Sequence, residues 1–181
     1  AFLDPSQRPR ITAALERQRP LWEPERDQGY HAATFGMYAS ELLERVAGEP
    51  IGPLLRRELF DPLGADVWVG APAEVRVRLA RLVAPHPVER AVRMGYEALR
   101  GDTVEGRVLL ASLRGDRLSL RTFVNPAPGP RGPARYGDDD VTSCELLWAS
   151  GVATARGLAR AYLPFALGGE VEGRRYFSAA S

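Results

Sequence analysis

The sequence predicts a helix-rich fold of mixed α and β structure. Apolar residues recur at spacings of three and four in several segments, which is the period of an amphipathic helix. A few short apolar runs are instead bounded by glycine and proline, which is the pattern of short strands. The chain has 181 residues, of which 45% are hydrophobic, enough for one domain with its own core.

Three helices are predicted in the first third of the chain. The first spans residues 8–18 and ends before Pro20. The second spans residues 32–47, with Gly48 as its C-terminal cap. Its predicted inward face consists of Phe35, Tyr38, Leu42 and Val46. The third helix spans residues 51–60.

Short strands and further helices are predicted in the rest of the chain. Residues 67–69 form a strand candidate, and alternating valine and arginine over residues 75–83 predict a second extended piece. Residues 118–124 allow either a strand or an irregular turn, and residues 125–140 predict a loop rich in proline and glycine. The remaining elements are helices over 88–100, 104–113 and 154–167 and a strand over 174–177. Because these strands have no obvious partners, we expect residues outside this chain to complete a larger sheet.

The composition disfavours several functional classes. A formal net charge of +1, with arginines interleaved among acidic residues, disfavours a nucleic-acid-binding domain. The two histidines lie far apart in the sequence and Cys144 is the one cysteine, so we expect no metal site, no cofactor and no internal disulfide. No apolar run is long enough for a membrane span and the start shows no signal peptide, which favours a cytoplasmic location. The absence of an initiator methionine fits a processed or truncated chain.

A charged, turn-rich segment over residues 22–29 leads to Tyr30, at the mouth of the helix predicted over residues 32–47. Such a segment presents a polar aromatic group at a surface, although periodicity alone also allows an ordinary core or interface tyrosine. All 24 basic side chains are arginine, so the chain contains no lysine. A tyrosine that acts as a base needs a nearby positive charge to lower its pKa, and lysine commonly supplies that charge.

Three stretches, in this order, resemble the serine β-lactamase-like hydrolases, in the branch of class C β-lactamases and their esterase, transesterase and penicillin-binding-protein-like relatives. They are residues 29–36 with 41–48, residues 58–70, and residues 150–162 with Gly168-Gly169-Glu170 behind them. Nearly the whole chain aligns with this pattern. The resemblance implies a cleft in which a Ser-x-x-Lys pair, a tyrosine element and a Lys-Thr-Gly or His-Thr-Gly strand meet.

The resemblance implies roles for particular residues. Tyr30 falls on the tyrosine element, as a catalytic residue that shares the general-base role, and His31 becomes a substrate contact or a helix-capping residue. Ala32 stands where β-lactamases have asparagine, which favours an esterase-like activity. Trp148 either lines the cleft or belongs to the core. Glu25 departs from the family pattern, because glycine often follows the proline at that point.

The other two family elements do not occur in these 181 residues. Ser40 and Ser150 have no partnered base within a recognisable motif, so neither replaces the missing nucleophile. The resemblance therefore implies a single β-lactamase-like domain over residues 1–181 that is incomplete at both ends. It would hold mainly the helical subdomain of the β-lactamase/transpeptidase-like fold, with the central antiparallel sheet largely missing.

Two functions remain open from the sequence. In the first, the chain is part of a serine hydrolase that forms an acyl-enzyme with a small ester or amide substrate, possibly a β-lactam, and is inactive by itself. In the second, it is a non-catalytic helical module or pseudoenzyme that acts in binding.

Overall fold

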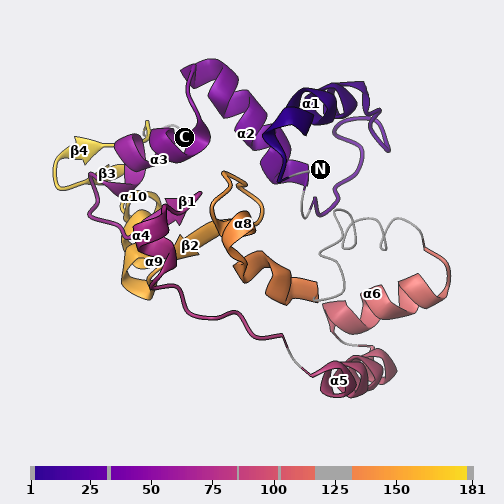
Figure 1. The fold of residues 1–181 in the computed structure, drawn as a ribbon. Coiled ribbons are helices and arrows are strands. Elements are labelled where there is room, and N and C mark those ends of the chain that lie inside the picture. Colours follow the sequence, from indigo (N-terminus) through magenta and orange to yellow (C-terminus); the bar gives the residue numbers. More distant parts are fainter. Residues whose placement is uncertain (1–2, 32–33, 85, 102, 117–131, 179–181) are drawn as a thin grey trace. The chain divides into compact units, whose positions relative to one another are not determined.

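The computed structural model describes residues 3–31, 34–84, 86–101, 103–116 and 132–178 (Figure 1). By its internal contacts the chain divides into two compact units. Unit 1 consists of Ala1–Gln18, Gly36–Leu79 and Asp139–Ser181. Unit 2 consists of Arg19–Phe35 and Ala80–Asp138.

The helical elements of unit 1 include most of the predicted ones. They are η1 (Pro5–Gln7), α1 (Arg8–Arg17), α2 (Thr34–Ala47, whose first two residues belong to unit 2), α3 (Ile51–Leu55), the π-helical turn η2 (Arg56–Phe60), α4 (Ala73–Arg76), α8 (Asp139–Thr142), α9 (Ala155–Ala161) and α10 (Leu163–Ala166). Unit 2 contains α5 (Pro87–Arg100), α6 (Val104–Leu113) and η3 (Gly132–Gly137). No helix in the described part of the chain is long and apolar enough to cross a membrane.

The strands of unit 1 find partners within the chain. Strand β1 (Val67–Val69) pairs antiparallel with β2 (Gly151–Ala153), a strand that the sequence pattern does not predict. Strands β3 (Glu170–Val171) and β4 (Arg174–Arg175) form a hairpin. The fold class is thus confirmed as helix-rich with small two-stranded sheets.

Several helix boundaries are confirmed. Helices α1, α5 and α6 lie where the periodicity predicts them, and α3 continues into η2 over the predicted range 51–60. Gly48 follows α2 with a φ of 73°, in the left-handed region that lets glycine end a helix. The predicted strand or turn over 118–124 lies outside the described residues.

Three secondary-structure predictions are wrong. The extended piece over 75–83 begins instead in helix α4, because Pro72 caps a turn that buries Val75 and leaves Val77 exposed. The helix over 154–167 breaks at Tyr162, after which α10 starts with a proline in its first turn. The described part of the loop predicted over 125–140 contains η3 and the start of α8.

The predicted inward face of α2 is also wrong. Phe35, Leu42 and Val46 are exposed, and the buried residue of this helix is Gly36. Within residues 154–167, Leu158, Tyr162 and Phe165 also recur at spacings of four and three, and they too are exposed. Periodicity identifies a stripe of apolar residues but not the neighbour that covers it.

The polar face of α2 instead meets α1 through paired charges. The Glu41 carboxylate accepts hydrogen bonds from the Thr12 hydroxyl at 3.1 Å and from Arg45 Nε at 2.8 Å. Arg45 also donates to Glu16 at 2.7 Å. Burial alone would raise the pKa of Glu41, but these hydrogen bonds and the nearby arginine charges outweigh it and lower the pKa. The two helices are therefore joined by an ion-pair network.

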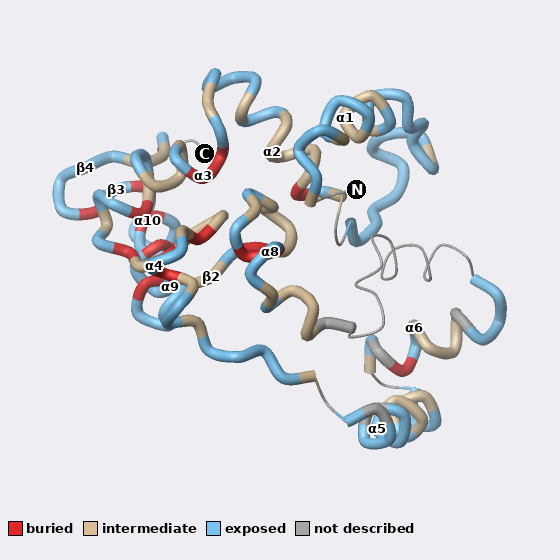
Figure 2. Tube along the Cα trace, viewed as in Figure 1, coloured by how far each residue is buried: buried red, intermediate tan, exposed pale blue. Residues whose placement is uncertain are grey.

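Buried residues gather around β1, α4, α9 and α10 (Figure 2). The core cluster contains Phe60, Ala65, Val67 and Ala161, with leucines of α3, η2 and the following turn packed against it. Gly157 of α9 lies so close to the backbone at the start of β1 that a Cβ atom there would come within 2.5 Å of the Asp66 carbonyl oxygen. Only glycine allows α9 to pack this closely on β1.

Asp66 links β1 to the segment after α4. Its carboxylate accepts two hydrogen bonds from the Arg78 guanidinium, both at 2.7 Å, and one from the Trp68 indole at 2.9 Å. These hydrogen bonds, first those from Arg78, lower the pKa of Asp66 from 3.8 to about 2. Bidentate pairs of arginine and carboxylate are among the stronger ion pairs of proteins.

The Asp66 pair predicts a loss of stability at acidic pH. A carboxylate whose pKa is lower in the folded state stabilises the fold above its ordinary pKa of 3.8, and this contribution is lost as the pH falls toward 2. Asp66→Asn should therefore lower the free energy of unfolding at pH 6, and its deficit relative to the wild type should shrink between pH 4 and 2. Chemical denaturation at several pH values measures this.

The matched control is Asp139→Asn. The Asp139 carboxylate lies 4.0 Å from Arg76 and is 85% exposed, so its replacement should change the free energy of unfolding little at any of these pH values. An Asp66→Asn deficit that stayed constant down to pH 2 would contradict the role given to the Asp66 carboxylate.

Candidate active site

The segment before α2, residues 19–31, has no helix or strand, and Tyr30 stands near its end. A turn at Glu23–Arg26 is closed by the Arg26 amide, which donates to the Glu23 carbonyl at 3.2 Å. The Trp22 indole N–H donates to the Asp27 carbonyl at 2.8 Å. Two local hydrogen bonds therefore shape the approach to Tyr30.

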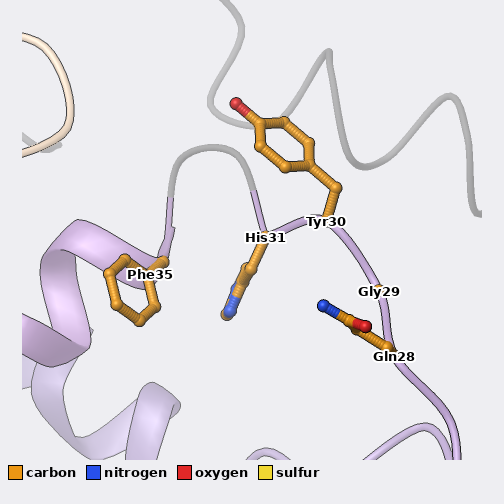
Figure 3. A pocket seen from close by; sticks show the side chains of 5 residues that line it. All are labelled: Gln28, Gly29, Tyr30, His31 and Phe35. Atoms are coloured by element: carbon orange, nitrogen blue, oxygen red, sulfur yellow. The ribbon is translucent and has the colours of Figure 1, made fainter. Parts of the chain in front are cut away.

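Tyr30 and His31 lie beside an open hollow of about 550 Å³. Gln28, Gly29 and Phe35 line the rest of this hollow, all within unit 2 (Figure 3). Figure 3 shows the side chains of Tyr30 and His31 pointing to opposite sides of the backbone. Tyr30 is 75% exposed.

His31 lies at the start of α2. Its Nε2 atom forms a hydrogen bond with the Thr34 hydroxyl, and its ring meets that of Phe35 edge-on, with the centroids 6.5 Å apart. These contacts hold the imidazole against the first turn of the helix. The same ring borders the hollow, so helix capping and substrate contact are compatible for this residue.

Trp148 belongs to unit 1, whereas the residues that line the hollow belong to unit 2. Its backbone packs against Gly36 of α2, where a Cβ atom would come within 2.8 Å of the Trp148 nitrogen. The main chain of Trp148 is therefore fixed by a close helix contact, and its side chain is half-buried.

The side chains of Ser40, Ser150 and Cys144 form hydrogen bonds with backbone groups. Ser150 is fully buried, and its hydroxyl bonds to both the amide and the carbonyl of Leu146. The Ser40 hydroxyl donates to the Gly36 carbonyl at 2.8 Å, and the Cys144 thiol to the Asp140 carbonyl at 3.0 Å. Among the described residues, no group of three or more His, Cys, Asp or Glu side chains could hold a metal ion.

A family model described as Beta-lactamase matches residues 2–179. The chain belongs to the beta-lactamase family. This confirms the resemblance to the serine β-lactamase-like hydrolases. In this beta-lactamase family member, Tyr30 remains the sequence-based candidate for the catalytic tyrosine.

Relatives of this family member include an esterase. The chain is 34% identical over 153 residues to "Esterase/beta-lactamase LipL" of Mycobacterium tuberculosis (strain ATCC 25618 / H37Rv). The aligned region covers 82% of this chain and 32% of LipL. A penicillin-binding protein homolog from Caulobacter crescentus shares the fold with a TM-score of 0.65 and 27% identity, over 96% of this chain and 40% of the homolog. EstA from Arthrobacter nitroguajacolicus Rue61a supports the fold alone, with a TM-score of 0.59 and 22% identity over 86% of this chain and 36% of EstA. The chain thus spans 32% to 40% of the length of these proteins.

The structure adds Trp22 and Gly29 to the surroundings of Tyr30. A Cβ atom on Gly29 would come within 2.7 Å of the Trp22 ring, so the indole lies directly on the glycine that precedes Tyr30. Neither residue stands out in the sequence alone. The available signal was a tryptophan and a glycine within one turn-rich segment, which alone indicates no contact.

Glu25 has a backbone conformation that glycine prefers. Its φ is 71°, and it follows Pro24 in the turn at Glu23–Arg26, the pattern of a type II turn, in which the third residue is usually glycine. The left-handed region costs a residue with a side chain about 1 kcal/mol. The departure from the family pattern at Glu25 thus coincides with backbone strain.

Glu25→Gly is expected to strengthen this turn. Relief of about 1 kcal/mol should slow hydrogen exchange of the Arg26 amide several-fold, because that amide closes the turn. Glu23→Gly is the matched control, since φ of Glu23 is not in the left-handed region, and it should speed the exchange or leave it unchanged. Equal effects of the two glycines would contradict the assignment of strain to Glu25.

Proposed function

We propose that the chain is part of a serine hydrolase that works through an acyl-enzyme on small ester or amide substrates, with esters favoured. The observation that carries the proposal is Tyr30, the sequence-based candidate for the family's tyrosine element, which is exposed beside the hollow at the start of α2. The identity to LipL, whose name includes both esterase and β-lactamase, supports this class of reaction.

The proposed reaction follows the chemistry of an activated serine. As the serine oxygen attacks the carbonyl carbon, its proton passes to the Tyr30 phenolate, and the carbonyl oxygen becomes an oxyanion. Collapse of this intermediate breaks the ester bond, and the departing alkoxide takes a proton from the Tyr30 phenol. Water then attacks the acyl-serine by the same proton transfers and releases the acid.

The chain by itself lacks two parts of this machinery. A phenol has an ordinary pKa of about 10 and acts as a base near neutral pH only beside a positive charge. The sequence contains no lysine and therefore no Ser-x-x-Lys pair. We propose that the serine nucleophile and the lysine that supplies the positive charge come from residues outside these 181, within one β-lactamase-like domain. The chain alone is then inactive.

Substrate contacts are proposed for two further residues. His31 borders the same hollow as Tyr30, and its ring is held by Thr34 and Phe35, so it offers a fixed polar group beside the tyrosine. Trp148, fixed by its backbone against Gly36, is proposed as an apolar wall for the substrate. Ala32 in place of asparagine removes an amide that would bind a lactam, which is why esters are favoured.

A non-catalytic binding module is the second candidate, because the absence of lysine equally fits a chain that has lost the chemistry. A fluorophosphonate probe, which reacts with activated serines, separates the two. The full-length protein should be labelled, and the 181-residue chain should not. Failure of the full-length protein to react would favour the binding module, and labelling of the chain itself would show a nucleophile within it.

Tyr30→Phe in the full-length protein should lower kcat/KM for an ester about 10²- to 10⁴-fold, because it removes the group that accepts the serine proton. Steady-state hydrolysis of p-nitrophenyl acetate measures this. The matched control is Tyr38→Phe, which also removes one phenol hydroxyl. That hydroxyl donates to the Leu15 carbonyl at 3.1 Å, so its loss should lower thermal stability slightly and leave turnover intact. Full activity of Tyr30→Phe would remove Tyr30 from the mechanism.

A further inference from the structure

Trp22 has an unusual place in the segment that leads to Tyr30. Every other residue of 19–31 is exposed, whereas Trp22 is half-buried. Its indole N–H donates to the Asp27 carbonyl at 2.8 Å, which bridges five residues of chain. Because this segment has no helix or strand, a bond of this kind is what gives it a fixed course.

The ring of Trp22 also lies against Gly29. Two ring atoms of Trp22 lie 2.7 and 3.1 Å from the position that a Cβ atom on Gly29 would take, and the shorter of these distances is below that of real Cβ contacts. Glycine therefore lets the indole lie against the backbone immediately before Tyr30. A side chain at residue 29 would push the indole away from Asp27.

We propose that Trp22 is a positioning residue for Tyr30, an inference that rests on the catalytic role proposed for this tyrosine. The indole holds Asp27 by its N–H and Gly29 by its ring, so the two residues next to Gln28 are fixed and Tyr30 follows directly. Gly29 directly precedes Tyr30, so the course of the backbone at Gly29 sets where the side chain of Tyr30 begins. Displacement of a reacting group by about 1 Å can cost a hundredfold in rate.

Trp22→Phe in the full-length protein tests the inference. The phenyl ring can still cover Gly29, but the bond to the Asp27 carbonyl is lost. We expect faster hydrogen exchange at the Gly29 and Tyr30 amides, and a kcat for p-nitrophenyl acetate that is about tenfold or more lower, with KM within about twofold. This split between kcat and KM distinguishes misplacement of a base from general loss of structure.

Two further variants sharpen the test. Gly29→Ala should have the same effect on kcat, because its methyl group displaces the indole, and the double variant should be little worse than either single one. Trp68→Phe is the matched control. It too loses one indole hydrogen bond, to Asp66 at 2.9 Å, but in unit 1, and it should lower the melting temperature without changing kcat.

The outcomes separate this inference from the proposed function. Unchanged exchange at Gly29 and Tyr30 in Trp22→Phe overturns the positioning role, and so does an unchanged kcat in an enzyme that Tyr30→Phe inactivates. If Tyr30→Phe itself leaves kcat unchanged, the function proposed for Tyr30 is wrong, and the positioning role, which rests on it, is wrong as well. Purely additive effects of Trp22→Phe and Gly29→Ala would also contradict the inference.

Discussion

The contact between Gly157 and the backbone of Asp66 is the constraint on which the core of unit 1 depends. It brings α9 within van der Waals distance of the start of β1, and the Thr154 amide beside it donates to the Asp66 carbonyl at 3.1 Å. Pairing of β1 with β2 follows, because β2 ends directly before Thr154. The Asp66 side chain then fixes Arg78, so one residue connects the small sheet, a helix and the chain beyond α4.

Sequence periodicity predicted which segments are helical better than which face of a helix is covered. The ranges of α1, α5 and α6 follow from local spacing, since helix formation depends on neighbours along the chain. The orientation of α2 did not follow, because its charged residues pair with those of α1 and leave Leu42 and Val46 exposed. Strand β2 was missed because Gly151-Val152-Ala153 carries too little apolar pattern to be recognised before its partner is known.

In the candidate site too, some features could be predicted from the sequence, whereas the contacts between residues could not. Tyr30 is a candidate from the sequence because its surroundings resemble a family pattern; the family is confirmed, and the role of Tyr30 stays a prediction. Trp22 could not be found in this way, since a tryptophan in a charged, turn-rich segment gives no indication that its indole reaches the Asp27 carbonyl and lies on Gly29. Contacts of this kind depend on the path of the backbone, which only the structure supplies.

The interactions that stabilise the core and those that shape the segment around Tyr30 lie in different units. The core cluster and the Asp66 ion pair lie in unit 1, whereas the segment that carries Tyr30 belongs to unit 2 and is shaped by a turn and one indole hydrogen bond. Short local bonds of this kind open at lower free-energy cost than a packed core does. A change at Trp22 should therefore alter the segment that carries Tyr30 while the core of unit 1 stays folded, and a change at Asp66 should weaken that core without altering the bonds around Trp22. Activity and stability should be separable by mutation for this physical reason.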